Sequence, residues 1–179
     1  NKLNSNDKTE KEILEETQKF LLQNEVITEN EDVNKKLNIL IKAIPEFLNV
    51  VGKKQHQTRQ YTVDCHTLKV LEETLKHPKF ETLTPQNKIL LQLAVILHDF
   101  GKDEGVIDSG HELKSAHLTN AILKKINLSE EKKDIITEFV KNHDWFAKLQ
   151  KGISKSEIAI MFKNPQELDM AEIFANSDL

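Results

Sequence analysis

The sequence has little of what secreted, disulfide-bonded and sheet-rich proteins depend on. It contains one cysteine (Cys65), five glycines and four prolines among 179 residues. A single cysteine excludes an intramolecular disulfide and a zinc site built from clustered cysteines, and it fits a reducing compartment. Sheet-rich folds need many turn residues, so the scarcity of glycine and proline favours long helices joined by short connections.

Long apolar runs are also missing. The longest, Ile89 to Leu97, is interrupted by Gln92 and is too short to cross a bilayer. The polar stretch from Asn1 to Glu12 does not resemble a secretory signal. We therefore expect a cytoplasmic protein with no membrane partner. The net charge of −4 argues against an extended nucleic-acid surface but allows a small basic site. Because the first residue is not Met, we expect the chain to be part of a longer protein.

Apolar residues recur with a helical period along nearly the whole chain, which predicts an all-α fold. The length suits one domain with a substantial core. The expected helices cover residues 9–22, 30–48, 63–75 and 112–125, and three more begin at Thr84-Pro85, Ser129 and Asn164-Pro165. Pro45 is expected to begin a separate turn near the end of the second helix.

The helix that begins at Pro85 is apolar on nearly every side from Ile89 to Leu97, so we expect it to be the most buried helix of the fold. His98 and Asp99 follow it directly. Two side chains that can bind metal, placed at the end of a rigid buried element, are held in position by packing. This position makes His98 and Asp99 the leading candidates for a functional site.

Four further polar side chains are candidates for the same interior site. They are His66, His111, His143 and Asp178. His143 continues the apolar stripe of its helix, and Asp178 shares a face with Phe174; a carboxylate on a buried face is costly unless a cation or hydrogen bonds compensate for it. Taken singly, each candidate could instead cap a helix or form an ion pair with a neighbouring residue. Together, imidazoles and carboxylates form a mixed ligand set that suits Mn, Fe, Zn, Ni or Mg.

The order of these residues resembles the HD superfamily of metal-dependent phosphohydrolases. The resemblance rests on His66, on His98-Asp99 within LHDFGK, and on Asp178. The segment YTVDCHTLKVL is similar to the first-histidine segment of bacterial uridylyl-removing enzymes and of the C-terminal HD domain of CCA-adding tRNA nucleotidyltransferases. GHELKSA and SEEKKDIITEFVKNHD are similar to the second half of those domains. The resemblance covers residues 44–179 and leaves residues 1–43 as an unassigned N-terminal helical extension.

The resemblance implies a helical bundle with one or two divalent metal ions at its centre. It implies that His66, His98, Asp99 and Asp178 hold the first ion. In family members with a second ion, Asp99 bridges the two, and the positions of His111 and His143 supply further ligands. An alternative stays open, in which those two histidines line the site and bind phosphate instead.

The expected reaction is hydrolysis of a phosphoester of a nucleotide, or of a nucleotidyl or RNA phosphodiester, by metal-activated water. Asp99 is expected to be catalytic. Lys102 could contact the phosphate as a point charge during catalysis or binding, and Arg59, the only arginine, could hold a phosphate bidentately. Lys102 and Arg59 could equally be solvated loop residues without a role in the site. The expected partner is therefore a phosphorylated small molecule or a nucleotide or RNA end. Two other functions stay open: a phosphatase of small nucleotides, and an inert HD module that binds or regulates.

Overall fold

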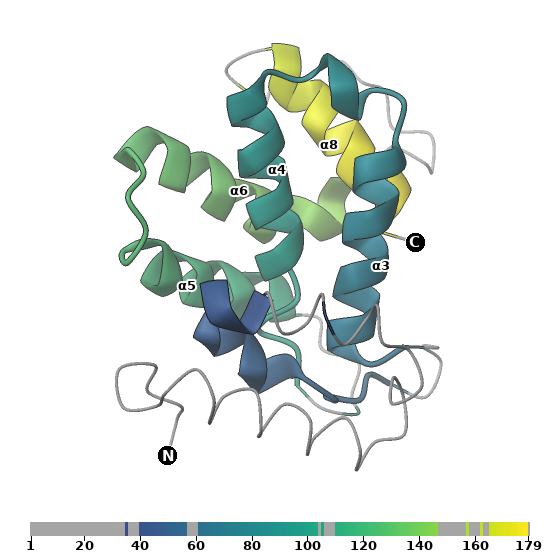
Figure 1. Ribbon diagram of the computed structural model, residues 1–179, viewed down its shortest axis with the longest axis vertical. Coiled ribbons are helices and arrows are strands. Elements are labelled where there is room, and N and C mark those ends of the chain that lie inside the picture. Colours follow the sequence, from purple (N-terminus) through teal and green to yellow (C-terminus); the bar gives the residue numbers. More distant parts are fainter. Residues whose placement is uncertain are drawn as a thin grey trace. The chain divides into compact units, whose positions relative to one another are not determined.

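The computed structural model describes residues 35, 40–56, 61–103, 105, 110–146, 157, 162 and 165–178. These residues form helices and connections without any strand, so the predicted all-α fold is confirmed for the part of the chain described (Figure 1). Within that part, no helix combines the length and apolar character needed to cross a membrane. The helix predicted over residues 9–22 lies outside the described residues.

The chain divides into two compact units. The first comprises Asn1–Leu68 and Lys102–Asp108, and the second comprises Lys69–Gly101 and Ser109–Leu179. The boundary predicted between residues 43 and 44 falls inside the first unit, and it stays a prediction.

The described part of the first unit contains a helical turn at 40–43, the 3-10 helix η1 (Pro45–Val50) and the start of helix α3 (Val63–Lys76). The helix predicted over 30–48 therefore ends before Ile44, and Pro45 begins a separate turn, as expected. Proline lacks the amide hydrogen that would continue the helix, and it disfavours helical angles in the residue before it. Ile44 accordingly has φ −132° and ψ 86°.

The second unit contains most of the regular structure. Its elements after α3 are η2 (Phe80–Thr82), α4 (Pro85–Leu97), α5 (His111–Leu123), α6 (Glu130–Phe146) and α8 (Pro165–Ser177). Helix α6 contacts α4, α5 and α8, and α4 also contacts α8 (Figure 1). Because α6 touches all three of the others, it organises the core of this unit.

Two predicted helix starts are confirmed by their capping contacts. The Thr84 Oγ1 atom accepts a hydrogen bond from the Asn87 amide at 3.1 Å, directly before Pro85. The Ser129 Oγ atom accepts one from the Lys132 amide at 3.3 Å. These hydroxyls satisfy amide hydrogens that have no partner inside the helix, which is why Ser and Thr favour this position. Asn164 lies outside the described residues.

Helix α4 is buried toward its C-terminal end. Leu91, Val95 and Leu97 have no exposed surface, whereas Ile89 is 54% exposed. The prediction of burial on every side is therefore wrong at Ile89, because one face of the N-terminal part of α4 lies at the surface. The buried end is the one that leads into His98 and Asp99.

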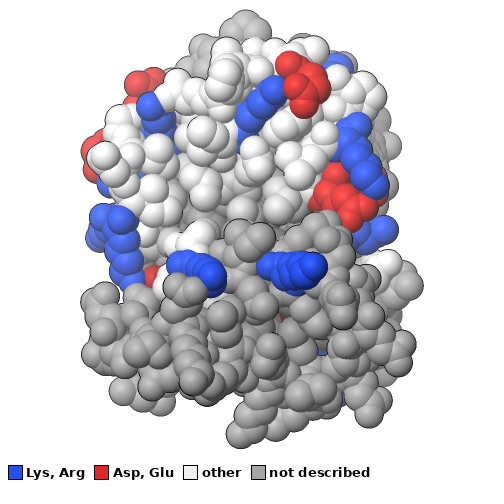
Figure 2. Space-filling model, viewed as in Figure 1, with Lys and Arg blue, Asp and Glu red and all other residues white. Residues whose placement is uncertain are grey.

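The surface seen in Figure 2 is of mixed charge where the structure describes it. Acidic and basic side chains lie beside one another in several places, and uncharged residues separate these places from one another. Interspersed charges of this kind produce weaker long-range fields than a patch of one sign.

Candidate metal centre

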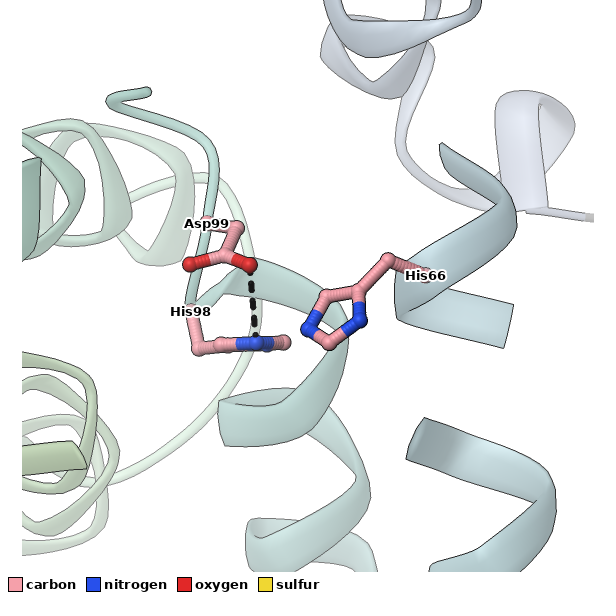
Figure 3. Close-up of side chains that lie close together, drawn as sticks. All are labelled: His66, His98 and Asp99. Carbon is pink, nitrogen blue, oxygen red and sulfur yellow. Dashed lines mark ion pairs between the residues drawn. The ribbon is translucent and has the colours of Figure 1, made fainter. Parts of the chain in front are cut away.

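Five of the predicted site residues meet within the second unit. They are His98, Asp99, His111, His143 and Asp178. The Asp99 Oδ2 atom lies 3.1 Å from His98 Nε2, the pair drawn in Figure 3. The Asp99 Oδ1 atom lies 3.2 Å from His111 Nε2 and 3.5 Å from His143 Nε2. Asp99 is therefore the carboxylate that joins three histidines.

Each of these side chains comes from the end of a helix. His98 and Asp99 follow α4, His111 is the first residue of α5, and His143 lies in the last turn of α6. Asp178 follows α8, and its amide donates to the Phe174 carbonyl at 2.9 Å. The Asp178 Oδ1 atom lies 3.6 Å from His98 Nε2. Four helices that pack on one another thus bring five side chains together.

A close approach between Gly101 and α5 helps to bring these ends together. The Gly101 amide donates to Ser115 Oγ at 2.7 Å inside the protein. A Cβ atom at residue 101 would lie 2.5 Å from Lys114 Cβ and 2.5 Å from the Ser115 amide nitrogen. Only glycine fits so close to a neighbouring backbone without displacing it. This contact explains the glycine of the LHDFGK segment in physical terms, because α5 carries His111 beside Asp99.

Two of the histidines are oriented by the helices that carry them. The His98 Nδ1 atom lies 2.5 Å from the Val95 carbonyl oxygen, and His143 Nδ1 lies 2.6 Å from the Val140 carbonyl oxygen. A carbonyl only accepts, so both Nδ1 atoms carry the hydrogen and donate. In the neutral ring, the lone pair is then on Nε2, the nitrogen that lies near Asp99, where it is available to a bound cation. Anchoring of one ring nitrogen is the arrangement typical of histidines that bind metal through the other.

The ionisable groups of the centre lie close enough to change one another's pKa values. Burial by itself disfavours a charged His98, but the adjacent carboxylates of Asp99 and Asp178 outweigh it and hold the pKa of His98 well above its ordinary value. Burial likewise disfavours a charged Asp99, yet His98 and hydrogen bonds from His111 and His143 hold the pKa of Asp99 well below its ordinary value. The centre therefore attracts positive charge to the space between its carboxylates.

The donor atoms fit a metal ion as well as protons. His98, His143 and Asp178 form one group of possible ligands, and Asp99, His111 and His143 form another; within each group the ligand atoms lie within 4.8 Å of one another. Both groups consist of imidazole nitrogen and carboxylate oxygen, and His143 belongs to both. This buried cluster could hold a metal ion, and the mixture of nitrogen and oxygen ligands suits a first-row divalent ion.

Two acidic side chains beside the centre were missed by the sequence analysis. The Asp144 Oδ1 atom lies 3.4 Å from His143 Nε2, and its Oδ2 atom lies 3.8 Å from His111 Nε2. The Glu112 Oε2 atom lies 3.7 Å from His111 Nδ1. Each acid directly follows one of the predicted histidines in the sequence, and that adjacency was the signal available for finding them.

Comparison with known proteins gives one partial similarity. The chain is 37% identical over 82 residues to a bifunctional uridylyltransferase/uridylyl-removing enzyme of Vibrio campbellii (strain ATCC BAA-1116). The similar region covers 39% of this chain and 9% of that enzyme. No family model matches the chain. The similarity therefore links a segment of the chain to a segment of a much longer, nucleotidyl-processing enzyme.

The remaining predicted residues belong to the first unit. His66 is buried in the first turn of α3 and is labelled in Figure 3. The Lys102 ammonium donates to Gln55 Oε1 at 2.7 Å. Arg59 lies outside the described residues. The roles assigned to His66, Lys102 and Arg59 stay predictions.

Proposed function

We propose that this chain is a metal-dependent phosphohydrolase of the HD type, with residues 44–179 as its hydrolase domain. Its substrate is a phosphoester of a nucleotide, or a nucleotidyl or RNA phosphodiester. The observation that carries the proposal is the buried carboxylate of Asp99, shared by the Nε2 atoms of His98, His111 and His143. Similarity to a segment of a uridylyl-removing enzyme supports the nucleotidyl substrate class.

In this proposal the ligands divide into two sets. His98, Asp99 and Asp178 bind the first divalent ion, with His66 as the fourth ligand. Asp99, His111 and His143 bind a second ion. The Val95 and Val140 carbonyls keep the Nε2 lone pairs of His98 and His143 available for binding, because each holds the hydrogen on Nδ1. When bound, a metal ion lowers the pKa of its water and neutralises charge on the phosphoryl oxygens.

The other proposed roles concern the phosphate. Lys102 follows Asp99 by three residues, and its half-buried ammonium is oriented by Gln55. We assign Lys102 to the phosphate as a point charge and Arg59 to the phosphate as a bidentate donor. Burial raises the pKa of the Cys65 thiol to about 11, which keeps the thiol inert. The proposed cytoplasmic location rests on the single cysteine, which fits a reducing compartment.

The test compares the wild type with Asp99→Asn after loading with Mn²⁺. The assay uses bis(p-nitrophenyl) phosphate, nucleoside monophosphates and short RNA oligonucleotides. Loss of the Asp99 carboxylate should reduce hydrolysis by about 100-fold or more, because the substituted amide is a poor metal ligand. The exposed His117 gives a matched control, and His117→Asn should retain full activity.

The substrates separate the proposal from its alternatives. Cleavage of the diester and of RNA supports the proposed function, whereas cleavage of nucleoside monophosphates alone supports a small-nucleotide phosphatase. Mn²⁺ binding without hydrolysis of any substrate in the set would instead identify an inert binding module.

A further inference from the structure

Asp144 occupies the outer side of the candidate centre. Its two carboxylate oxygens face different histidines, with Oδ1 3.4 Å from His143 Nε2 and Oδ2 3.8 Å from His111 Nε2. Asp99 faces the same two nitrogens from inside the protein, through its Oδ1 atom. The two Nε2 atoms, 3.2 Å apart, therefore each lie within 3.8 Å of an oxygen of both carboxylates.

The exposure of the two carboxylates differs sharply. The Asp99 side chain is 2% exposed, whereas that of Asp144 is 56% exposed. An aspartate on the surface of a helix is fully hydrated when it points outward, and nothing in local helix geometry requires it to turn toward buried imidazoles. The carboxylate oxygens of Asp144 nevertheless lie near two buried imidazole nitrogens, where a cation could bind between them.

His111 has a further acidic neighbour that bears on its orientation. Glu112 Oε2 lies 3.7 Å from His111 Nδ1, so a negative charge favours the hydrogen on that nitrogen. At His98 and His143, a backbone carbonyl oxygen holds the hydrogen on Nδ1. The Nε2 atoms of all three histidines lie near Asp99, and the Nδ1 atoms of His98 and His143 donate to carbonyls. Glu112 also joins His111 and Asp144 in a group whose possible ligand atoms lie within 4.8 Å of one another.

We infer that Asp144 is an additional ligand of the second ion, which it binds from the solvent side together with His111 and His143. This inference rests on the proposed function, because it assumes that the centre binds metal. Two imidazoles and two carboxylates suit Mn²⁺, Fe²⁺, Co²⁺, Ni²⁺ or Zn²⁺ better than Ca²⁺, which prefers an all-oxygen ligand set. Asp144 is then the ligand nearest the solvent from which the substrate arrives.

The experiment measures Mn²⁺ binding to the full chain by calorimetry and by metal analysis after gel filtration. We expect two ions per wild-type chain. Asp144→Asn should keep the first ion with unchanged affinity and should weaken the second by at least about 10- to 100-fold. Asp134→Asn is the matched control, since it makes the same change at an exposed position of α6 and should bind both ions as the wild type does. Circular dichroism confirms that each variant is folded.

The outcomes separate this inference from the proposed function. Two ions bound equally well by Asp144→Asn and by the wild type would overturn the role of Asp144, and so would a wild type that binds a single ion. Neither result affects the first ion or the Asp99→Asn test. A wild type that binds no Mn²⁺ would overturn both proposals together.

Discussion

At the scale of single residues, the most consequential group is His98. Its ring is fully buried, its Nδ1 atom is tied to the Val95 carbonyl, and its Nε2 atom faces the carboxylates of Asp99 and Asp178. Those carboxylates hold the pKa of His98 well above its ordinary value despite its burial. Without metal, this shift favours the protonated imidazole.

This state predicts that metal binding releases a proton. A metal ion binds only the neutral imidazole, so protons and metal compete for His98 and the apparent metal affinity should rise with pH. The folding stability of the metal-free protein changes with pH in the opposite direction, because it falls as the pH rises. There, the stabilisation from the charged His98 is fully present below the pKa of an unfolded histidine, and it is lost as the pH rises through the raised pKa.

Calorimetry at pH 7 in buffers of different ionisation enthalpy measures this proton. We expect the observed binding enthalpy to depend on the buffer, with net proton release for the first ion. His117→Ala removes an exposed histidine and should release the same number of protons as the wild type. A binding enthalpy that is the same in every buffer would contradict the protonated state of His98.

At the scale of the helices, the contact between Gly101 and α5 decides how closely His111 approaches Asp99. A methyl group at residue 101 would meet Lys114 Cβ and the Ser115 amide at 2.5 Å each. Backbone atoms cannot move aside as a flexible side chain can, so α5 would have to shift.

Gly101→Ala should therefore lower the free energy of unfolding by about 1–3 kcal/mol, the usual cost of overpacking. The shift of α5 should also weaken binding of the second metal ion. Urea unfolding and Mn²⁺ titration measure the two effects. The control Asn120→Ala changes an exposed residue of the same helix and should alter neither quantity by much. Wild-type stability in Gly101→Ala would show that α5 does not need this close approach.

The helices also show which structural features sequence periodicity can predict and which it cannot. The period and the capping residues predicted α3 over 63–75 and the starts of α4 and α6, because these depend on local interactions. Periodicity could not show that Ile89 lies where α4 meets the solvent, since the surface is set by the neighbouring elements. The contacts of Asp144 were missed for a related reason: an exposed residue belongs to no apolar stripe.

At the scale of the second unit, the centre acts as a junction of helices. Helices α4, α5, α6 and α8 each contribute at least one side chain at or next to an end. Residues far apart in the chain meet there, as in the contact of 3.6 Å between His98 Nε2 and Asp178 Oδ1. An ion that binds all of them would stabilise the folded state, because the unfolded chain cannot assemble the same ligands.

Addition of Mn²⁺ should therefore raise the melting temperature, and chelation should reverse the rise. At a free ion concentration 100 times its Kd, the expected stabilisation is about 2.7 kcal/mol for one site. Differential scanning calorimetry with Mn²⁺ and with EDTA measures the shift, and Asp99→Asn should show a much smaller one. Identical melting of the wild type under both conditions would argue against a metal centre.

The position of Asp178 has a consequence for the order in which the centre is assembled. His98, Asp99, His111 and His143 lie within 46 consecutive residues, and Asp178 follows His143 by 35 residues. During synthesis, four of the five donors therefore leave the ribosome before Asp178. Lys79 later helps to secure α8 through ion pairs with Asp169 and Glu172. A chain cut before α8 would keep the proposed ligands of the second ion and lose Asp178, a proposed ligand of the first, so we expect proteolysis there to weaken the first site more than the second.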